Sequence, residues 1–252
     1  MCIRDRSHIG ILSSNGSKAR VFYAHEDKKI HFNFLNQKKT SKHEHIDSIT
    51  EVLAVGNSGR SHFLFLSYDQ TGVLVLNEYD INANQIYSSA VALAPPEMLN
   101  EEWTCAGRDG HVFLSVGRMA LWKFPHGEYA TIALQEPVHK ISFNLNANNV
   151  CALLSGANEV SIVNTKKSGK STEFVNLYSS ISGEKPFATF TNNGQVVIID
   201  QFKGEVYKID QLSSPIATFS YPPDQGDPVD ICGYGPRGFV ILTNKSKLVA
   251  FL

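Results

Sequence analysis

Residues 62–79 read HFLFLSY-DQTG-VLVLNEY, with an apolar segment over His62–Tyr68, a polar tetrapeptide and a second apolar segment over Val73–Tyr79. Asp and Gly in the tetrapeptide tolerate the positive φ values that a tight reversal of the chain needs. Val, Leu, Phe and Tyr on both sides favour extended strands. The stretch therefore predicts a β-hairpin.

The same hairpin pattern occurs six times along the chain. Its other copies are Ile9–Ser14 with Ala19–Tyr23, His111–Val116 with Met119–Phe124, Val150–Ser155 with Val160–Asn164, Gln195–Asp200 with Glu205–Asp210, and Gly238–Thr243 with Lys247–Leu252, with Lys203-Gly204 expected as the fifth turn. Equivalent positions near the end of each second strand are Phe22, Leu76, Trp122, Val163, Ile209 and Phe251, spaced by 54, 46, 41, 46 and 42 residues. Because no window shows a sustained helical period, this spacing predicts an all-β propeller rather than a helical repeat.

Further apolar segments complete each repeat to four strands, which we call a, b, c and d from the inner to the outer edge. Strand d is expected at Ile30–Leu35, Ile86–Leu93, Tyr129–Leu134, Glu173–Leu177 and Ile216–Tyr221, and strand a at Ile49–Val55, Glu101–Ala106, Val138–Leu145, Pro186–Phe190 and Val229–Gly233. Four-stranded units in series are the blades of a β-propeller. We therefore expect about six blades over residues 8–252, the first and last incomplete, in a single domain.

One repeat shows a family resemblance. Val138-x-x-Ile141-Ser142-Phe143, Val150–Ser155 and Val160–Asn164 together resemble a blade of the WD-repeat family. Asn164 and Val163 stand where that family usually has Asp and Trp. In other repeats Asp210 matches the family's Asp and Trp122 matches its Trp, but no repeat has both. Gly110-His111 is displaced from the usual Gly-His position. The resemblance implies a propeller and, by its common use, a protein-binding scaffold.

The two ends of the chain carry expectations of their own. Met1-Cys2-Ile3-Arg4-Asp5-Arg6 resembles translated sequencing-adapter read-through, and residues 1–7 are interpreted as a non-native or disordered segment outside the fold. Strand a of the first blade and the closing d strand are expected upstream, so the domain is predicted to be N-terminally truncated. Ile9–Ser14 and Lys247–Leu252 then have open edges, and we expect the chain to be less soluble than a version extended upstream by roughly 20–30 residues.

Composition excludes several classes of protein. The 23 Lys and Arg nearly balance the 24 Asp and Glu, which gives no general attraction to nucleic acid or anionic membrane. Apolar runs are shorter than a membrane span requires. Cys105, Cys151 and Cys232 are widely separated, so buried thiols are expected rather than disulfides, which slightly favours an intracellular location.

The sequence predicts no catalytic, cofactor-binding or metal-binding residue. His43-Glu44-His45 with Asp47 has metal-ligand types but lies in a polar connector, where a solvated loop is the preferred interpretation. Gly169-Lys170-Ser171-Thr172 imitates a phosphate-binding loop, yet Asn164 replaces the required first glycine and a strand follows. Trp103 and Trp122 are interpreted as packing residues.

Basic residues and long connections are the remaining candidates for binding. Lys38, Lys39, Lys42 and His43 lie in a d–a connection, whereas Lys166, Lys167 and Lys170 lie between c and d, at the opposite end of a blade. A single nucleic-acid surface is therefore not expected. The d–a connections Ala94–Met98, Tyr178–Glu184 and Pro222–Pro228 are longer than the b–c turns and carry Pro, Tyr and acidic residues, as binding loops often do. The alternative interpretation is that proline only stiffens these connectors.

Three functional hypotheses follow. The preferred one is a non-catalytic scaffold that binds protein partners on its d–a face within a larger assembly. The second is a propeller enzyme, such as a hydrolase, lyase or quinone-dependent dehydrogenase, with a site over the central channel. The third, supported only by the lysine clusters, is a subunit of an RNA-processing or ribosome-assembly complex. Several titratable groups in mutual hydrogen-bond reach at the inner strands would favour the enzyme.

Overall fold

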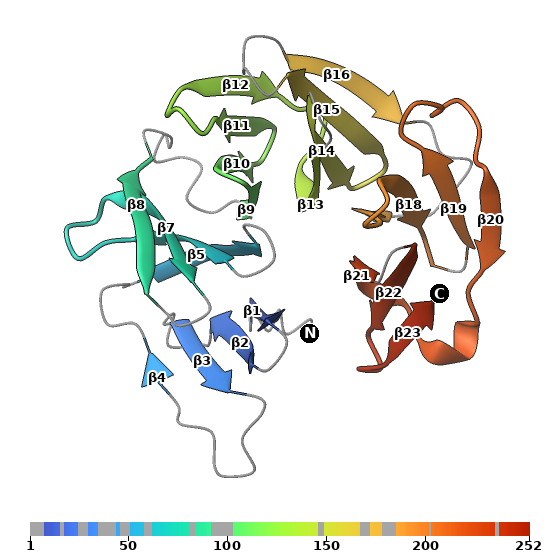
Figure 1. The fold of residues 1–252 in the computed structure, drawn as a ribbon, viewed down its shortest axis with the longest axis horizontal. Helices are drawn as coiled ribbons and strands as arrows, with labels where there is room; N and C mark the ends of the chain where they lie inside the picture. The colour runs from blue at the N-terminus through green and yellow to red at the C-terminus, as the bar shows by residue number, and fades with distance from the viewer. Residues whose placement is uncertain are drawn as a thin grey trace. The chain divides into compact units, whose positions relative to one another are not determined.

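The computed structural model describes residues 8–15, 18–24, 30–34, 44–45, 51–57, 62–80, 84–91, 103–145, 149–166, 172–177, 185–201, 203–234 and 237–252. These residues form 23 β-strands in six antiparallel sheets (Figure 1). Their one helical element is the 3-10 turn η2 (Pro223–Gln225). The expectation of an all-β chain with consecutive strands in successive sheets is confirmed.

The chain divides into two compact units, Met1–Ile132 and Ala133–Leu252, with three sheets in each. The first unit contains β1 (His8–Asn15), β2 (Lys18–Ala24), β3 (Ile30–Phe34) and β4 (Glu44–His45); β5 (Glu51–Asn57), β6 (His62–Tyr68), β7 (Leu74–Asp80) and β8 (Gln85–Ala90); β9 (Trp103–Arg108), β10 (His111–Val116), β11 (Met119–Lys123) and β12 (Tyr129–Ala133). The prediction of a single domain over 8–252 stays a prediction.

The second unit contains β13 (Val138–Leu145), β14 (Asn149–Gly156), β15 (Val160–Lys166) and β16 (Thr172–Leu177); β17 (Phe187–Phe190), β18 (Gln195–Ile199), β19 (Lys203–Lys208) and β20 (Ala217–Ser220); β21 (Pro228–Tyr234), β22 (Gly238–Thr243) and β23 (Leu248–Phe251). Strand β13 lies beside β17, and β17 lies beside β21. The first strand of each sheet therefore forms its inner edge, as expected for strand a.

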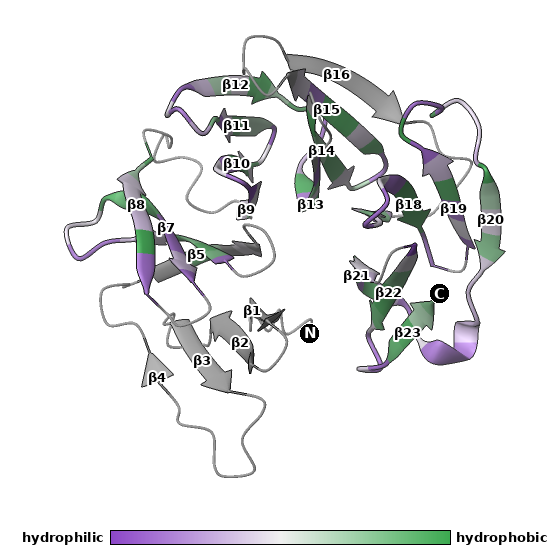
Figure 2. Cartoon of the chain, in the orientation of Figure 1, coloured by the Kyte–Doolittle hydropathy of each residue, from purple (hydrophilic) through white to green (hydrophobic). Residues whose placement is uncertain are grey.

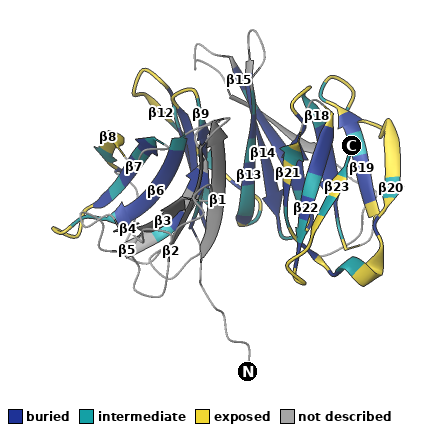
Figure 3. Ribbon diagram, turned by 60° about the horizontal axis from the view of Figure 1, so that its bottom comes forward, coloured by how far each residue is buried: buried dark blue, intermediate teal, exposed yellow. Residues whose placement is uncertain are grey.

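The cores lie on the second strands. Val196, Val197, Ile198 and Ile199 of β18 are all fully buried, because neighbouring sheets cover both faces of this strand. Outer strands differ: β20 is exposed at three of its four residues. Figure 3 shows the contrast, with β18 largely buried and β20 in yellow. The continuous apolar runs in the sequence predicted this double-sided burial.

The first sheet corrects one expectation. It was predicted to be incomplete, but Glu44 and His45 form β4, which pairs with β3 through Phe32↔Glu44 and His31↔His45. Two polar residues carry no apolar strand signal, so the backbone pairing with β3 was invisible in the sequence. The last sheet has three strands among the described residues, as predicted.

A second correction concerns the fifth hairpin. Lys203-Gly204 was expected to be its turn, but both residues belong to β19. The reversal comes earlier, because the Asp200 carboxylate accepts the Lys203 N–H at 3.0 Å and the Lys203 carbonyl accepts the Asp200 N–H. Gly204 is needed inside the strand, since a Cβ there would collide with the ring of Phe219 on β20.

Inner strands share a local irregularity. The pairing register shifts between Val52 and Ala54, between Val138 and Lys140, and between Pro228 and Asp230. Such bulges bend a strand and re-aim the side chains next to them. The shifts at Lys140 and Asp230 place charged residues at equivalent points of two inner strands.

Candidate functional site

The segment Pro222–Pro228 is the predicted d–a connection that the structure describes in full. Ala94–Met98 and Tyr178–Glu184 lie outside the described residues. Pro222 adopts an extended conformation, η2 makes one tight turn, and Gly226 then takes φ 97°. Proline fixes the entry to the turn, and glycine tolerates the left-handed exit.

Hydrogen bonds tether this segment to the β22–β23 turn. The Asp227 N–H donates to Asn244 Oδ1 at 3.0 Å, and Asn244 Nδ2 donates to Asp227 Oδ2 at 3.0 Å. Thr243 Oγ1 donates to the Gln225 carbonyl at 2.9 Å, and Lys245 Nζ donates to the Asp224 carbonyl at 3.2 Å. The d–a and b–c connections therefore meet at one end of the sheet, and segment 222–228 is held as a fixed platform.

The fourth sheet uses the same device. Glu136, in the connection before β13, accepts the N–H groups of Asn158 and Glu159 at 2.8 and 2.9 Å, and Asn158 Nδ2 at 2.9 Å. In each case an acidic residue just before strand a bonds to the b–c turn of its own sheet. The Glu136 carboxylate accepts backbone N–H groups, whereas the Asp227 carboxylate accepts the Asn244 side-chain amide and its carbonyl accepts the Asn244 N–H. This pairing of two connections is a repeated feature of the second unit.

The fifth sheet departs from this arrangement. Lys185 lies two residues before Phe187, the first paired residue of β17. Glu136 has the equivalent position, two residues before Val138, the first paired residue of β13. Its N–H donates at 2.7 Å to the Ala157 carbonyl in the turn of the preceding sheet. Its φ is 55°, an uncommon conformation for a non-glycine residue. A cation here cannot accept backbone N–H groups. In this turn the Asp200 carboxylate, within the turn itself, accepts the Lys203 N–H instead.

A groove of about 390 Å³ opens at this point, between the fifth and sixth sheets. Its lining combines two carboxylates, one ammonium group, one amide and an apolar floor, provided by Asp200, Asp227, Lys185, Gln201, Phe187, Pro228 and Val229. Val229 is 41% exposed, which is unusual for an aliphatic side chain on an inner strand. The groove can therefore accept an apolar group flanked by a positive charge.

Tyr221 packs under this end of the sheet, in a cluster that also contains Phe187. Burial raises the pKa of its hydroxyl, and the negative charges of Asp227 and Asp224 raise the pKa further. Because each carboxylate disfavours a second negative charge nearby, this effect indicates a negative potential around the platform.

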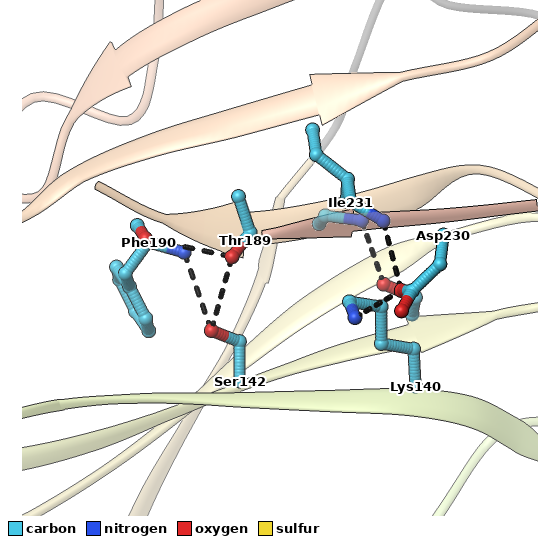
Figure 4. Close-up of polar contacts among 8 residues, drawn as sticks. Lys140, Ser142, Thr189, Phe190, Asp230 and Ile231 are labelled. Atoms are coloured by element: carbon cyan, nitrogen blue, oxygen red, sulfur yellow. Dashed lines mark hydrogen bonds and ion pairs between the residues drawn. The ribbon is translucent and has the colours of Figure 1, made fainter. Parts of the chain in front are cut away.

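A second polar cluster lies on the inner strands themselves. Figure 4 shows Lys140 of β13 directed at Asp230 of β21, and the two form an ion pair. The Lys140 side chain is 18% exposed and that of Asp230 is 37% exposed. Asp230 Oδ1 also accepts the Ile231 N–H at 2.8 Å. This ion pair links the first and last inner strands of the second unit.

Serines complete the inner cluster. Ser142 Oγ accepts the Phe190 N–H at 3.3 Å and lies 3.4 Å from Thr189 Oγ1 (Figure 4). Ser155 Oγ accepts the Ala188 N–H at 3.0 Å. An edge strand leaves every second N–H unpaired, and these hydroxyls satisfy two such groups on β17. Ser142 therefore joins the inner strands β13 and β17, and Ser155 joins the second strand β14 to β17.

Lys140, Asp230 and Lys185 were not predicted from the sequence as site residues. The available signal for Lys140 and Asp230 was a charged residue at the third position of an inner strand, where VHK and PVD occupy equivalent places. Their meeting depends on strand neighbours 90 residues apart in the chain. That adjacency is not visible in any local pattern.

The other sequence candidates have separate positions. His43 and Asp47 lie outside the described residues, as do Lys38, Lys39, Lys42, Lys167, Lys170 and residues 169–171, while Thr172 begins β16.

Trp103 and Trp122 are buried, at 6% and 0% exposure, in agreement with a packing role. Within the described ranges no three His, Cys, Asp or Glu residues gather as a metal site would require. No helix there is long and apolar enough to cross a membrane.

The three described cysteines are free thiols. Burial raises the pKa of Cys105 to about 12 and that of Cys151 to about 11. Cys232 is exposed on β21, and its pKa is raised by partial burial and by Asp230, while Lys140 opposes the shift. Only a deprotonated, accessible thiol reacts rapidly.

We expect one fast-reacting thiol in a Cys2→Ser variant treated with Ellman's reagent at pH 8. Cys232 should react first, and Cys105 and Cys151 should react at least ~100-fold more slowly until the protein unfolds. A Cys232→Ser control should remove the fast phase. Folding raises the pKa of the buried Cys105 thiol from 9.0 to about 12. The stability that this protonated thiol contributes is therefore fully present below about pH 9 and is lost as the pH rises toward 12. Three fast thiols in the native protein would contradict this accessibility.

Comparisons with known proteins identify the fold. No protein family matches the sequence, and no curated protein is significantly similar. Virginiamycin B lyase from Staphylococcus aureus has a similar structure, with TM-score 0.62 and 12% identity over 99% of this chain and 85% of that chain. BBS1N in complex with ARL6DN gives TM-score 0.58 and 12% identity over 97% and 77%. Hsv2p from Kluyveromyces lactis gives TM-score 0.58 and 12% identity over 97% and 74%. The predicted β-propeller fold is confirmed.

Proposed function

We propose that this protein is a non-catalytic, WD-repeat-like propeller that binds a partner protein at the end of its sheets where the d–a and b–c connections meet. The observation that carries the proposal is the groove of about 390 Å³ beside a tethered loop. Hydrogen bonds already order segment 222–228, so binding there costs little additional loop entropy. Rigid loops of this kind, carried on a sheet scaffold, are frequent sites of recognition.

The lining of the groove supports a proposal for the partner's chemistry. Asp200 and Asp227 outnumber Lys185, and Val229 exposes an aliphatic surface between them. A segment with a Lys or Arg next to an apolar residue complements this combination. BBS1N, one of the similar structures, is itself found in complex with ARL6DN, a precedent for a propeller that binds a protein.

We expect alanine replacement of Pro222, Pro223 and Asp224 to weaken partner binding at least ~10-fold without unfolding the protein, because all three side chains are exposed on the platform. The partner is first captured with a photo-reactive residue at Gln201, and its affinity is then measured by calorimetry. Ser213, Ser214 and Pro215, exposed in the c–d connection at the opposite end, form the matched alanine control. Equal loss in both variants, or loss in neither, would contradict the proposal.

The second candidate is an enzyme, favoured by the similarity to virginiamycin B lyase. A catalytically inactive form of that lyase has been crystallised with quinupristin. Incubation of the purified protein with quinupristin, followed by mass spectrometry, tests this hypothesis directly. Turnover above a buffer blank that is lost in Lys140→Met or Asp230→Asn would overturn the non-catalytic proposal.

A further inference from the structure

Among the described residues, Lys185 is the one cation that lines the groove. Its side chain is exposed, and its ammonium group forms no ion pair or hydrogen bond with any residue of the described chain. Lys245 and Lys247, in the neighbouring β22–β23 turn, instead donate to the Asp224 carbonyl and to Gln225 Oε1 at 3.2 and 3.3 Å. The charge of Lys185 therefore remains available to a bound partner.

The backbone fixes the point from which the Lys185 side chain extends. Its φ of 55° is rare for residues other than glycine. The Lys185 N–H donates to the Ala157 carbonyl at 2.7 Å, and the next residue, Pro186, is buried. Such a conformation persists only where the surrounding structure imposes it, and it is frequent at binding sites. Because the backbone is already ordered, an anion that pairs with Lys185 immobilises only the side chain.

The rest of the lining supplies an anion and an apolar surface. Asp227 Oδ2 accepts the Asn244 side-chain amide at 3.0 Å, whereas Oδ1 accepts no hydrogen bond from the described chain. Phe187 and the partly exposed Val229 line the same groove. Figure 2 shows the adjoining turn η2 in purple, as hydrophilic, whereas β20 before it is largely green. The groove therefore offers a cation, an anion and an apolar surface to one occupant.

We propose that the partner segment bound in this groove carries an Asp or Glu beside its basic and apolar residues, and that this carboxylate pairs with Lys185. This inference rests on the proposed function and adds an anionic group to the partner. A segment with basic residues alone would place like charge against Lys185, which lowers its affinity.

A carboxylate suits the groove better than a phosphorylated residue. A phosphate group carries a charge of nearly −2, and it would face the carboxylates of Asp200 and Asp227 in the same groove. The single negative charge of Asp or Glu needs only the one ammonium group of Lys185. Lys185 therefore determines specificity, because it selects segments of mixed charge over purely basic or phosphorylated ones.

Three blocked peptides test this selection: acetyl-Gly-Arg-Leu-X-Gly-amide with glutamate, glutamine or phosphoserine at X. Their dissociation constants are measured by titration into the isotope-labelled full chain, followed by NMR. We expect the glutamate peptide to bind at least ~5-fold more tightly than the other two at low ionic strength, because it alone gains a charge-assisted hydrogen bond without added repulsion. The preference should decrease at high salt, since the groove is open to solvent.

Variants at Lys185 assign the preference to this side chain. Lys185→Met removes the charge but keeps a long unbranched side chain, so the preference for the glutamate peptide should disappear, whereas Lys185→Arg should retain it. Lys208→Met is the matched control, because Lys208 is also exposed but lies at the end of β19 away from the Asp200–Lys203 turn. Circular dichroism verifies that each variant is folded.

Several results would overturn the proposal: equal affinity for the glutamate and glutamine peptides, tighter binding of the phosphoserine peptide, a preference that survives Lys185→Met, or no binding of any peptide. Capture of a partner at Gln201 tests the proposed function separately. A partner captured there whose affinity does not change in Lys185→Met would overturn this inference and leave the proposed function intact.

Discussion

Trp122→Ala is expected to lower the free energy of unfolding by about 3–5 kcal/mol, because a fully buried indole would be replaced by a cavity. Trp122 packs between Phe113 and Phe124, with ring centroids 5.6 and 5.9 Å away. Its Nε1 donates to His111 Nδ1 at 3.2 Å. The loss is a large part of the ~5–15 kcal/mol that stabilises a typical domain.

Guanidinium unfolding followed by circular dichroism measures this change. Trp122→Phe keeps most of the apolar volume and loses the N–H donor, so it should cost only about 1–2 kcal/mol. Thr131→Ala, at an exposed position of β12, is the surface control and should stay within about 0.5 kcal/mol of the natural protein. A Trp122→Ala protein as stable as the Thr131→Ala control would refute the packing role of this indole.

Tryptophan fluorescence adds information about the units. Trp103 and Trp122 are the chain's two tryptophans, and both lie in the first unit. Fluorescence therefore reports unfolding of the first unit alone, whereas circular dichroism reports both. Separate transitions by the two probes would show that the units unfold independently.

Gly233→Ala is expected to destabilise the second unit by about 2–3 kcal/mol, because backbone atoms block the added methyl group. A Cβ at Gly233 would lie 2.5 Å from the Phe190 carbonyl oxygen and 3.3 Å from Thr191 Cα. Both atoms belong to the neighbouring inner strand β17 or the residue after it. Relief would require the two inner strands to separate.

Gly204→Ala provides a matched comparison, because there the obstacle is the ring of Phe219. Double-mutant cycles with denaturant unfolding distinguish the two cases. Phe219→Ala should relieve much of the Gly204→Ala cost, whereas Phe190→Ala should leave the Gly233→Ala cost nearly unchanged, since the carbonyl remains. Equal relief at both sites would show that β17 and β21 do not approach closely through their backbones.

The sequence contained most of the information about local structure. Alternating and continuous apolar runs predicted all six hairpins, because strand burial imposes its own residue pattern. The turn at Gly117-Arg118 was placed correctly, since Val116 pairs with Met119 and Gly117 has φ 51°. The fifth turn was misplaced because the Asp200 carboxylate, rather than a glycine, determines where the chain reverses.

For the candidate site, the sequence alone singled out the d–a connection Pro222–Pro228 as a candidate binding loop, because Pro, Asp and Gly occur in a connection longer than a hairpin turn. The tertiary structure decided which residues lie beside that connection. Lys140 meets Asp230 across 90 residues of chain, and Lys185, Asp200 and Asp227 line one groove. Hairpins form between neighbours in sequence, so their residue patterns are local. Contacts between sheets depend on bulges, on glycines such as Gly233 and on the spacing of adjacent inner strands, and these exist only once the sheets pack.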